Sequence, residues 1–250
     1  MRPPKNILVT GASSGIGAAT AIAAAECGYD VGIGYHRDRE GAEITAKRVT
    51  EKGQKAIILQ ADISNPDDVE EMFDRFDDEL GEIGVLVNNA GIAAPVARVD
   101  QIDPARLGRM FGVNTFGAFF CARQAAIRMS WGNGGMGGVI VNVSSVAARL
   151  ASAGTYVDYA ASKGALDVLT MGMGREMAAD RVRVVGVRPG IIDTEIHAKG
   201  GDADRARDIS NELPMKRPGS AGEVADTILY LMSDRASYIT ATSIDVSGGR

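Results

Sequence analysis

The chain has 250 residues, of which 45% are hydrophobic and 24% charged, and its formal net charge at pH 7 is -5. Lysine and arginine are scattered without a basic run, which argues against a nucleic-acid partner. No apolar run approaches the ~18 residues that span a bilayer, and no signal-peptide segment follows Met1. We therefore expect a cytoplasmic protein without a membrane segment. Residues 1–250 are predicted to form one domain because no Pro/Ser-rich linker divides them.

Cysteine and histidine are scarce in this chain. Cys27 and Cys121 each fall in a predicted helix without metal-ligand spacing, and we expect both to be small buried thiols. The two histidines are His36 and His197. The chain therefore has few side chains that could form a zinc site or a His-based catalytic pair, and we predict no metal.

The first structural signal is a glycine-rich turn between a short apolar run at 7–9 and an alanine-rich helix predicted over 18–27. Gly11, Gly15 and Gly17 form a G-x-x-x-G-x-G pattern. Such glycines let the backbone turn sharply and let a pyrophosphate approach the amides at a helix N-terminus, where the helix dipole favours an anion. The alternative is a tight turn that binds no ligand.

The same turn also spells G-x-S-x-G, the nucleophile elbow of α/β-hydrolases, with Ser13 as the nucleophile. Two observations argue against this hydrolase alternative. No earlier segment of the sequence can supply an oxyanion-hole loop, and only His197 comes late enough to act as the base.

The second predicted strand, at 31–35, ends where a dinucleotide-binding fold meets the adenine ribose, about 20 residues past the glycine turn. An NAD-selective site needs a carboxylate there for the 2′-hydroxyl, but His36 and Arg37 precede the first acid, Asp38. A guanidinium suits a 2′-phosphate. We therefore predict a preference for NADP(H), with NAD(H) as the alternative. An ordinary solvated loop cation is the other interpretation of Arg37.

Polar residues follow the next two predicted strands. Asp62 comes after the strand at 56–60, and it can accept from an adenine amino group or cap the following turn. The strand at 85–87 runs into Asn88-Asn89-Ala90-Gly91. The amide side chains can hold a crevice open while the glycine lets a ligand lie against the chain. A plain asparagine-rich turn would look similar.

Polar residues also occur in or directly after two further apolar segments. The long helix predicted over 104–129 contains Asn114, and asparagine is locally unfavourable inside a helix. Its side chain either bonds outward to water or belongs to a site. The apolar run at 139–143 predicts a buried strand that delivers Ser144 and Ser145 to its carboxyl end. Ligands bind at that edge of open parallel sheets.

Tyr159 and Lys163 are four residues apart on a predicted helix and therefore share one face. At ~4 Å and an effective dielectric of ~20, their attraction is about 4 kcal/mol, equivalent to roughly three pKa units before desolvation opposes it. This would bring the phenol's pKa toward physiological pH, where acid/base catalysis is most effective. By itself, the pattern is also common on helix surfaces.

Taken together, these residues resemble the classical branch of the short-chain dehydrogenase/reductase family over essentially the whole chain. The matching residues, in the family's order, are Thr10-Gly11-x-x-x-Gly15-x-Gly17, Asp62, Asn88-Asn89-Ala90-Gly91, Asn114, Ser145, Tyr159-x-x-x-Lys163 and Pro189-Gly190 with Thr194. The resemblance implies an α/β fold, a doubly wound Rossmann-type domain with a seven-stranded parallel sheet (order 3-2-1-4-5-6-7) and helices on both faces. Ala241 stands where the family usually has glycine, so that turn is expected to differ.

The resemblance also implies residue roles. Ser145 would donate to the substrate's carbonyl oxygen, and Tyr159 would pass it a proton as hydride arrives from the nicotinamide. Lys163 would lower the tyrosine's pKa and bind the nicotinamide ribose, and Asn114 would hold a water in the proton relay. The implied cofactor contacts are Gly11, Ser13, Ser14, Gly15, Ile16, Gly17, His36, Arg37, Asp62, Ile63, Asn89, Ala90, Gly91, Tyr159, Lys163, Pro189, Gly190, Ile192 and Thr194.

The implied reaction is hydride transfer between NADP(H) and a carbonyl or alcohol substrate. The chain is most similar in general appearance to 3-oxoacyl-[acyl-carrier-protein] reductases, whose substrates are carrier-linked, and sugar or polyol dehydrogenases of glucose-dehydrogenase type are the alternative. A non-catalytic dinucleotide-binding sensor is an alternative of another class, which the complete tetrad disfavours. The family's substrate lid corresponds to 191–213, which includes His197. A homotetramer is expected, because the family's subunits pair through the long helices after strands four and five.

Overall fold

The computed structural model describes residues 3–194 and 210–250. Seven strands form one parallel sheet in the order β3-β2-β1-β4-β5-β6-β7. They are β1 (Asn6–Val9), β2 (Asp30–Tyr35), β3 (Ala56–Gln60), β4 (Val85–Asn88), β5 (Gly138–Val143), β6 (Val182–Pro189) and β7 (Thr242–Val246). The predicted strand order is confirmed. The order reverses between β1 and β4, which is where open α/β sheets bind their ligands.

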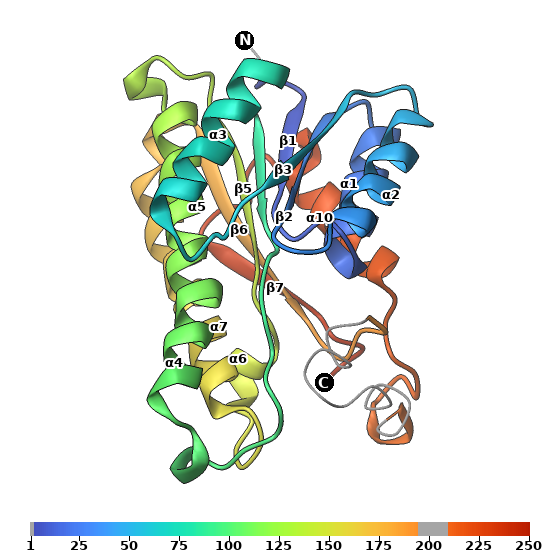
Figure 1. The fold of residues 1–250 in the computed structure, drawn as a ribbon, viewed down its shortest axis with the longest axis vertical. Coiled ribbons are helices and arrows are strands. Elements are labelled where there is room, and N and C mark those ends of the chain that lie inside the picture. Colours follow the sequence, from blue (N-terminus) through green and yellow to red (C-terminus); the bar gives the residue numbers. More distant parts are fainter. Residues whose placement is uncertain (1–2, 195–209) are drawn as a thin grey trace.

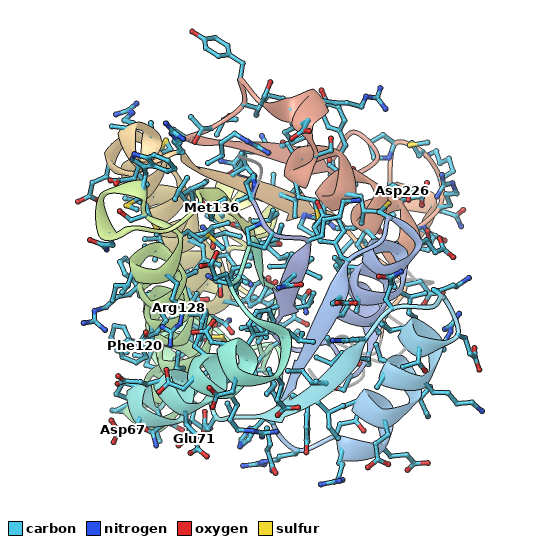
Figure 2. The ribbon with its side chains drawn as sticks, turned by 90° about the horizontal axis from the view of Figure 1, so that it is seen from above. Asp67, Glu71, Phe120, Arg128, Met136 and Asp226 are labelled. Atoms are coloured by element: carbon cyan, nitrogen blue, oxygen red, sulfur yellow. The ribbon has the colours of Figure 1, made fainter. Side chains whose placement is uncertain are left out.

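Helices cover both faces of the sheet (Figure 1). One face carries α1 (Gly15–Glu26), α2 (Arg39–Thr50) and α10 (Ala221–Met232), and the other carries α3 (Pro66–Leu80), α4 (Pro104–Phe111), α5 (Ala118–Met129) and α7 (Val157–Glu176). The short α6 (Ala147–Leu150) follows β5. Single turns are η1 (Val99–Gln101), η3 (Trp131–Asn133), η4 (Ala178–Asp180), η5 (Ser210–Glu212) and η6 (Asp234–Ala236). Figure 2 shows Arg128 on the α5 side of the sheet and Asp226 on the opposite, α10 side.

The two layers follow from the alternation of side chains along each strand. In β1, Ile7 and Val9 are buried in the cluster that includes the alanines of α1 and the apolar face of α10. Leu8, between them, belongs to the other cluster, with Phe73 and Phe76 of α3. The sheet is therefore buried on both faces, as an all-parallel sheet requires. Polar side chains that the strands carry are left for the sheet's ends.

The helix predicted over 104–129 is a continuous helical run, but a π-helical segment, η2 (Gly112–Gly117), separates α4 from α5. Asn114 lies in this segment and is fully buried. Insertions of π geometry inside α-helices occur frequently at functional sites. Of the two interpretations of Asn114, the outward-facing one is therefore wrong.

Two expectations about single residues are corrected by the structure. Cys27 directly follows α1 and is exposed, whereas Cys121 is buried as expected. Ala241 adopts a φ of 56°, in the left-handed region that glycine favours. Its amide donates to the Val184 carbonyl at 2.8 Å. The turn thus keeps a glycine-like backbone even though it carries a side chain.

Within residues 3–194 and 210–250, no helix is long and apolar enough to cross a membrane. The same residues contain no group of three or more His, Cys, Asp or Glu side chains placed to hold a metal ion.

Candidate active site

The glycine-rich turn connects β1 to α1 and is too tightly packed to carry side chains. Gly11 and Gly15 have φ values of 64° and 56°, which glycine adopts without steric cost. A Cβ atom on Gly17 would lie 2.4 Å from the Gly11 carbonyl oxygen and 2.5 Å from the Asn89 amide nitrogen. The turn therefore presents bare backbone at the start of α1, which is the surface that a pyrophosphate needs.

The end of β4 holds this turn in place through its amide side chains. Asn89 donates from Nδ2 to the carbonyls of Thr10 at 2.9 Å and Gly11 at 3.0 Å. The Thr10 hydroxyl in turn accepts from the backbone amides of Asn89 and Ala90, both at 3.0 Å. Asn88 instead points into the fold, donating to the Ala118 carbonyl. The adjacent asparagines therefore have different tasks, and Asn89 is the one that shapes the crevice.

A cleft opens at this switch point of the sheet. Its lining includes most of the residues predicted to contact a dinucleotide: Gly11, Ser13, Ser14, Gly15, Ile16, His36, Arg37, Asp62, Ile63, Asn89, Ala90, Gly91 and Thr194. Gly17 lies behind the turn, buried against it. Residues that the sequence did not single out also line the cleft, among them Met72, Ile92, Arg109 and Val113. Ile92 belongs to the loop after β4, and the other three come from helices whose position only the fold reveals.

At the outer end of the cleft, the carboxylates of Asp62 and Asp38 both accept hydrogen bonds from neighbouring residues of the protein. Asp62 accepts from the amide and hydroxyl of Ser64 at 3.0 and 2.7 Å. These bonds hold the pKa of Asp62 below its ordinary value although burial opposes them. Asp38 caps α2 by accepting from the Gly41 amide at 3.0 Å. The structure shows Asp62 capping the turn, and its contact with an adenine amino group stays a prediction. No hydrogen bond or ion pair engages the Arg37 side chain among the described residues.

A second pocket adjoins the cleft and shares part of its wall, namely Ile16, Asn89, Gly91 and Thr194. Ser145, Tyr159 and Lys163 all line this pocket. Ser145 follows β5, and the other two lie one turn apart on α7. Residues from separate elements, predicted from the sequence, therefore come together at one place beside the cleft.

The electrostatics of this pocket differ from the prediction. Burial raises the pKa of the Tyr159 phenol, and a hydrogen bond with Ser145 opposes this only in part. Lys163 donates from Nζ to the Val143 carbonyl at 2.8 Å, and Nζ lies 5.9 Å from the centre of the Tyr159 ring. The expectation that Lys163 brings the phenol's pKa toward neutrality is not met in this structure, because burial raises that pKa and the ammonium is turned toward the Val143 carbonyl.

Lys163 is itself strongly affected by its surroundings. Burial lowers the pKa of Lys163 to about 8, and the carboxylate of Asp167 acts in the opposite direction. Asp167 is held in turn by Arg188, with an Nε to Oδ2 distance of 2.8 Å. Burial of the charged ammonium therefore opposes folding. This ammonium lies next to the residue that is predicted to transfer the proton.

Asn114 stands on the other side of Gly91 from the cleft. Its Oδ1 accepts from the Ile92 amide at 2.8 Å, and its Nδ2 donates to the Ile92 carbonyl at 3.0 Å and the Ser162 hydroxyl at 3.1 Å. A Cβ atom on Gly91 would lie 3.3 Å from both Asn114 Oδ1 and Lys163 Nζ. Asn114 and Lys163 therefore both pack closely against Gly91, where a side chain would require one of them to shift.

The loop after β6 and the segment predicted as the lid are described in part. Pro189, Gly190, Ile192 and Thr194 all line the second pocket. Ile192 pairs with Gly219 in an isolated parallel bridge, which fixes the start of the segment predicted as the lid. The remainder of that segment over 195–209, with His197, lies outside the described residues.

The sequence did not single out several residues of this second pocket. Leu150, Ser152, Tyr156 and Arg250 line it together with the predicted residues. Tyr156 lies three residues before Tyr159, so helical spacing could have indicated it. No local signal marks Leu150 or Arg250, because only the packing of β7's end against α6 brings them here.

The comparisons with known proteins agree with this geometry. The family model described as Enoyl-(Acyl carrier protein) reductase matches residues 11–250. The protein named Uncharacterized oxidoreductase YgfF from Escherichia coli is 48% identical over 97% of this chain and 98% of its own length. Cis-4-hydroxycyclohexanecarboxylate dehydrogenase from Sinomonas cyclohexanicum is 37% identical (97% and 94%). The 3-oxoacyl-[acyl-carrier-protein] reductase FabG from Staphylococcus aureus is 32% identical (100% and 99%).

Solved structures are similar over the whole fold. A short-chain type dehydrogenase/reductase from Mycobacterium marinum has a TM-score of 0.91 at 33% identity, covering 98% of this chain and 94% of its own. A 3-ketoacyl-(acyl-carrier-protein) reductase from Brucella melitensis complexed with NADH has 0.90 at 30% (98% and 97%). A short chain dehydrogenase from Burkholderia cenocepacia in complex with NADP has 0.89 at 31% (100% and 99%).

The fold defines a Rossmann-type protein with a cleft at the switch point of its parallel sheet, the place where proteins of this class bind a dinucleotide. Within that class, the chain belongs to the short-chain dehydrogenase/reductase family, whose members are oxidoreductases that use a nicotinamide cofactor.

Proposed function

We propose that this protein is a cytoplasmic, NADP(H)-preferring reductase of carbonyl compounds, with 3-oxoacyl thioesters as its substrate class. The observation that carries the proposal is the shared wall between the dinucleotide cleft and the pocket that contains Ser145, Tyr159 and Lys163. A substrate in that pocket lies between a proton donor and the cleft. A nicotinamide dinucleotide, when bound, supplies or accepts the hydride.

The residues around the pocket support proton donation by Tyr159. Because burial raises the pKa of its phenol, Tyr159 is protonated at neutral pH and can act as the acid in a reduction. Ser145 accepts from the Ala147 amide at 3.1 Å, which leaves its own proton for the phenol oxygen or a substrate oxygen. Lys163, with a pKa of about 8, is mostly cationic at pH 7 and favours negative charge developing nearby. In this proposal Asn114 supports Lys163 and holds a water in the proton relay.

The walls of the pocket indicate the kind of substrate. The described part of the walls is largely apolar, with Val146, Leu150 and Ile191, and it includes one cation besides Lys163, which is Arg250. A guanidinium suits a carboxylate or phosphate. The names of two relatives support this choice, since one contains a carboxylate and the other a 3-oxoacyl group on a carrier protein.

The experiment that tests the proposal follows NADPH oxidation across 3-oxoacyl thioesters, 4-oxocyclohexanecarboxylate, neutral ketones and sugars. We expect the thioesters to have the highest kcat/KM and the anionic ketone to exceed its neutral counterpart. Arg250→Ala should remove that advantage without affecting neutral ketones. If sugars have a higher kcat/KM than the thioesters and the anionic ketone, the protein is instead a sugar or polyol dehydrogenase. Binding of NADPH without turnover of any substrate would favour a sensor.

Arg37 is expected to carry the preference for NADP(H). Arg37→Ala should weaken NADPH binding by about 10–100-fold, the loss expected for charge-assisted hydrogen bonds worth ~1.5–3 kcal/mol, and leave NADH binding unchanged. Arg39→Ala is the matched control, since Arg39 pairs with Glu43 at 2.8 Å and does not line the cleft. Fluorescence titration of both cofactors measures the effect. An equal loss of NADPH affinity in the two variants would show that Arg37 does not contact the cofactor.

We further propose that the subunits form a homotetramer. Apolar side chains are exposed along α5 and α7, including Phe119, Ile127, Val168 and Met171. An exposed apolar surface of this kind more often indicates a protein–protein interface than a helix face that stays in contact with solvent. Sedimentation velocity at micromolar protein should give a species of about four subunits. A stable monomer would contradict the proposal.

A further inference from the structure

One buried ion pair lies directly beside the proposed proton donor. Arg106 of α4 binds Asp158 of α7 through two bonds, from Nε to Oδ2 at 2.7 Å and from Nη2 to Oδ1 at 3.1 Å. The side chains are 12% and 0% exposed, respectively. Removing one partner of such a pair is costly, because the other charge stays buried. The geometry therefore fixes α4 to the first turn of α7.

Asp158 immediately precedes Tyr159, and its carboxylate interacts with the start of the helix that carries the phenol. Burial disfavours the charged form, but Arg106 and the backbone N–H of Tyr159 hold the pKa of Asp158 below its ordinary value. The anion sits in the first turn of α7, where the helix dipole stabilises negative charge. The orientation of that turn thus depends on a carboxylate that Arg106 keeps charged.

The same guanidinium reaches a third segment. Arg106 donates from Nη1 to the Pro95 carbonyl at 2.7 Å. Two residues further along, the Ala97 amide donates to the Thr155 carbonyl at 2.9 Å, just before α7 begins. This stretch continues from Gly91, which separates the cleft from Lys163. Arg106 therefore joins the loop after β4 to the start of α7, on either side of the second pocket.

We propose that Arg106 and Asp158 are positioning residues for Tyr159, which hold its helix turn and the loop after β4 in register. This inference rests on the proposed function, since it assumes that Tyr159 transfers the proton. Within residues 3–194 and 210–250, the charged and titratable groups near the phenol are Lys163 on the same helix, the ion pair itself, and Tyr156 and Arg250 in the pocket lining.

The chain contains a matched pair for comparison. Arg128 of α5 binds Asp74 and Asp77 of α3, and its side chain is 17% exposed. It lies on the outer helical layer (Figure 2) and does not line either the cleft or the second pocket. Loss of Arg128 therefore tests the cost of breaking a helix-to-helix ion pair without any effect on the phenol.

The test compares Arg106→Gln with Arg128→Gln in the full chain. In Arg106→Gln the carboxylate of Asp158 stays ionised at the alkaline pH where tyrosine titrates, and this negative charge should raise the pKa of Tyr159 by roughly one pH unit. Tyrosinate absorbance, with Tyr159→Phe subtracted, measures the shift without substrate or cofactor. We expect kcat to fall by about 10–100-fold with NADPH affinity retained. Arg128→Gln should show neither effect.

A double variant separates the positioning role from loss of stability. Arg106→Gln with Asp158→Asn removes both charges, so the pKa of Tyr159 should return to its original value and kcat should recover in part. If Arg106→Gln does not fold, Asp158→Asn alone should still lower kcat, with a smaller change in the titration. The proposal is overturned if Arg106→Gln matches Arg128→Gln in both measurements. If Tyr159→Phe retains full turnover, the proposed function fails instead.

Discussion

Tyr159→Phe is expected to lower kcat for carbonyl reduction by about 10²–10⁴-fold, the usual contribution of a positioned general acid, while NADPH binds as before. The phenyl ring fills the same space, so the helix and pocket walls stay in place. What is lost is the hydroxyl that Ser145 contacts and that burial keeps protonated at neutral pH. The loss should therefore appear in kcat rather than in cofactor affinity.

Tyr156→Phe is the control for this variant. Tyr156 lines the same pocket and lies three residues earlier. Its loss should change kcat by only a few-fold, since the proposal gives it no proton to transfer. Stopped-flow hydride transfer with the best substrate, together with NADPH fluorescence titration, separates the two effects. Unchanged turnover in Tyr159→Phe would refute the mechanism, and loss of NADPH binding would indicate damage to the fold.

Local patterns were sufficient to predict the fold. The glycine turn, the buried apolar strands and the asparagines after β4 are each encoded by a few adjacent residues, and the family's order of motifs then fixes the strand order that the structure has. Asn114 shows how a local conflict becomes informative. Asparagine is unfavourable inside a helix, and the structure resolves the conflict with a π-helical segment and bonds to Ile92.

The parts that could not be predicted depend on contacts between distant segments. Arg106 and Asp158 are separated by 52 residues, and no periodicity connects them. The direction of the Tyr159 pKa is a second example. Spacing alone indicates a nearby ammonium, but the balance between burial and charge depends on how Lys163 is turned, here toward the Val143 carbonyl. Side-chain direction inside a site is set by packing, which the sequence pattern does not contain.

Lys163→Met should abolish most turnover and yet stabilise the protein at neutral pH. Burial lowers the pKa of Lys163 from 10.5 to about 8, which corresponds to roughly 3 kcal/mol against folding at neutral pH. Methionine is apolar and of similar length, so the substitution should recover part of this unfavourable free energy. The Val143 carbonyl loses a bond, at a cost of about 1 kcal/mol. We therefore expect the free energy of unfolding to increase by about 1–2 kcal/mol at pH 7.

The dependence on pH distinguishes this explanation from a simple packing effect. Below pH 8 the lysine is charged in both states, so the full cost of burial is present. Between about 8 and 10.5 the folded lysine has lost a proton that the unfolded lysine still holds, so wild-type stability gains from this group as the pH rises. The advantage of Lys163→Met should therefore shrink from pH 7 to pH 9.5 in urea unfolding at one protein concentration. Lys52→Met, at an exposed ion pair with Glu26, is the control and should show no such trend. A difference that stays constant with pH, or a less stable variant at pH 7, would show that Lys163 is buried without the electrostatic cost argued here.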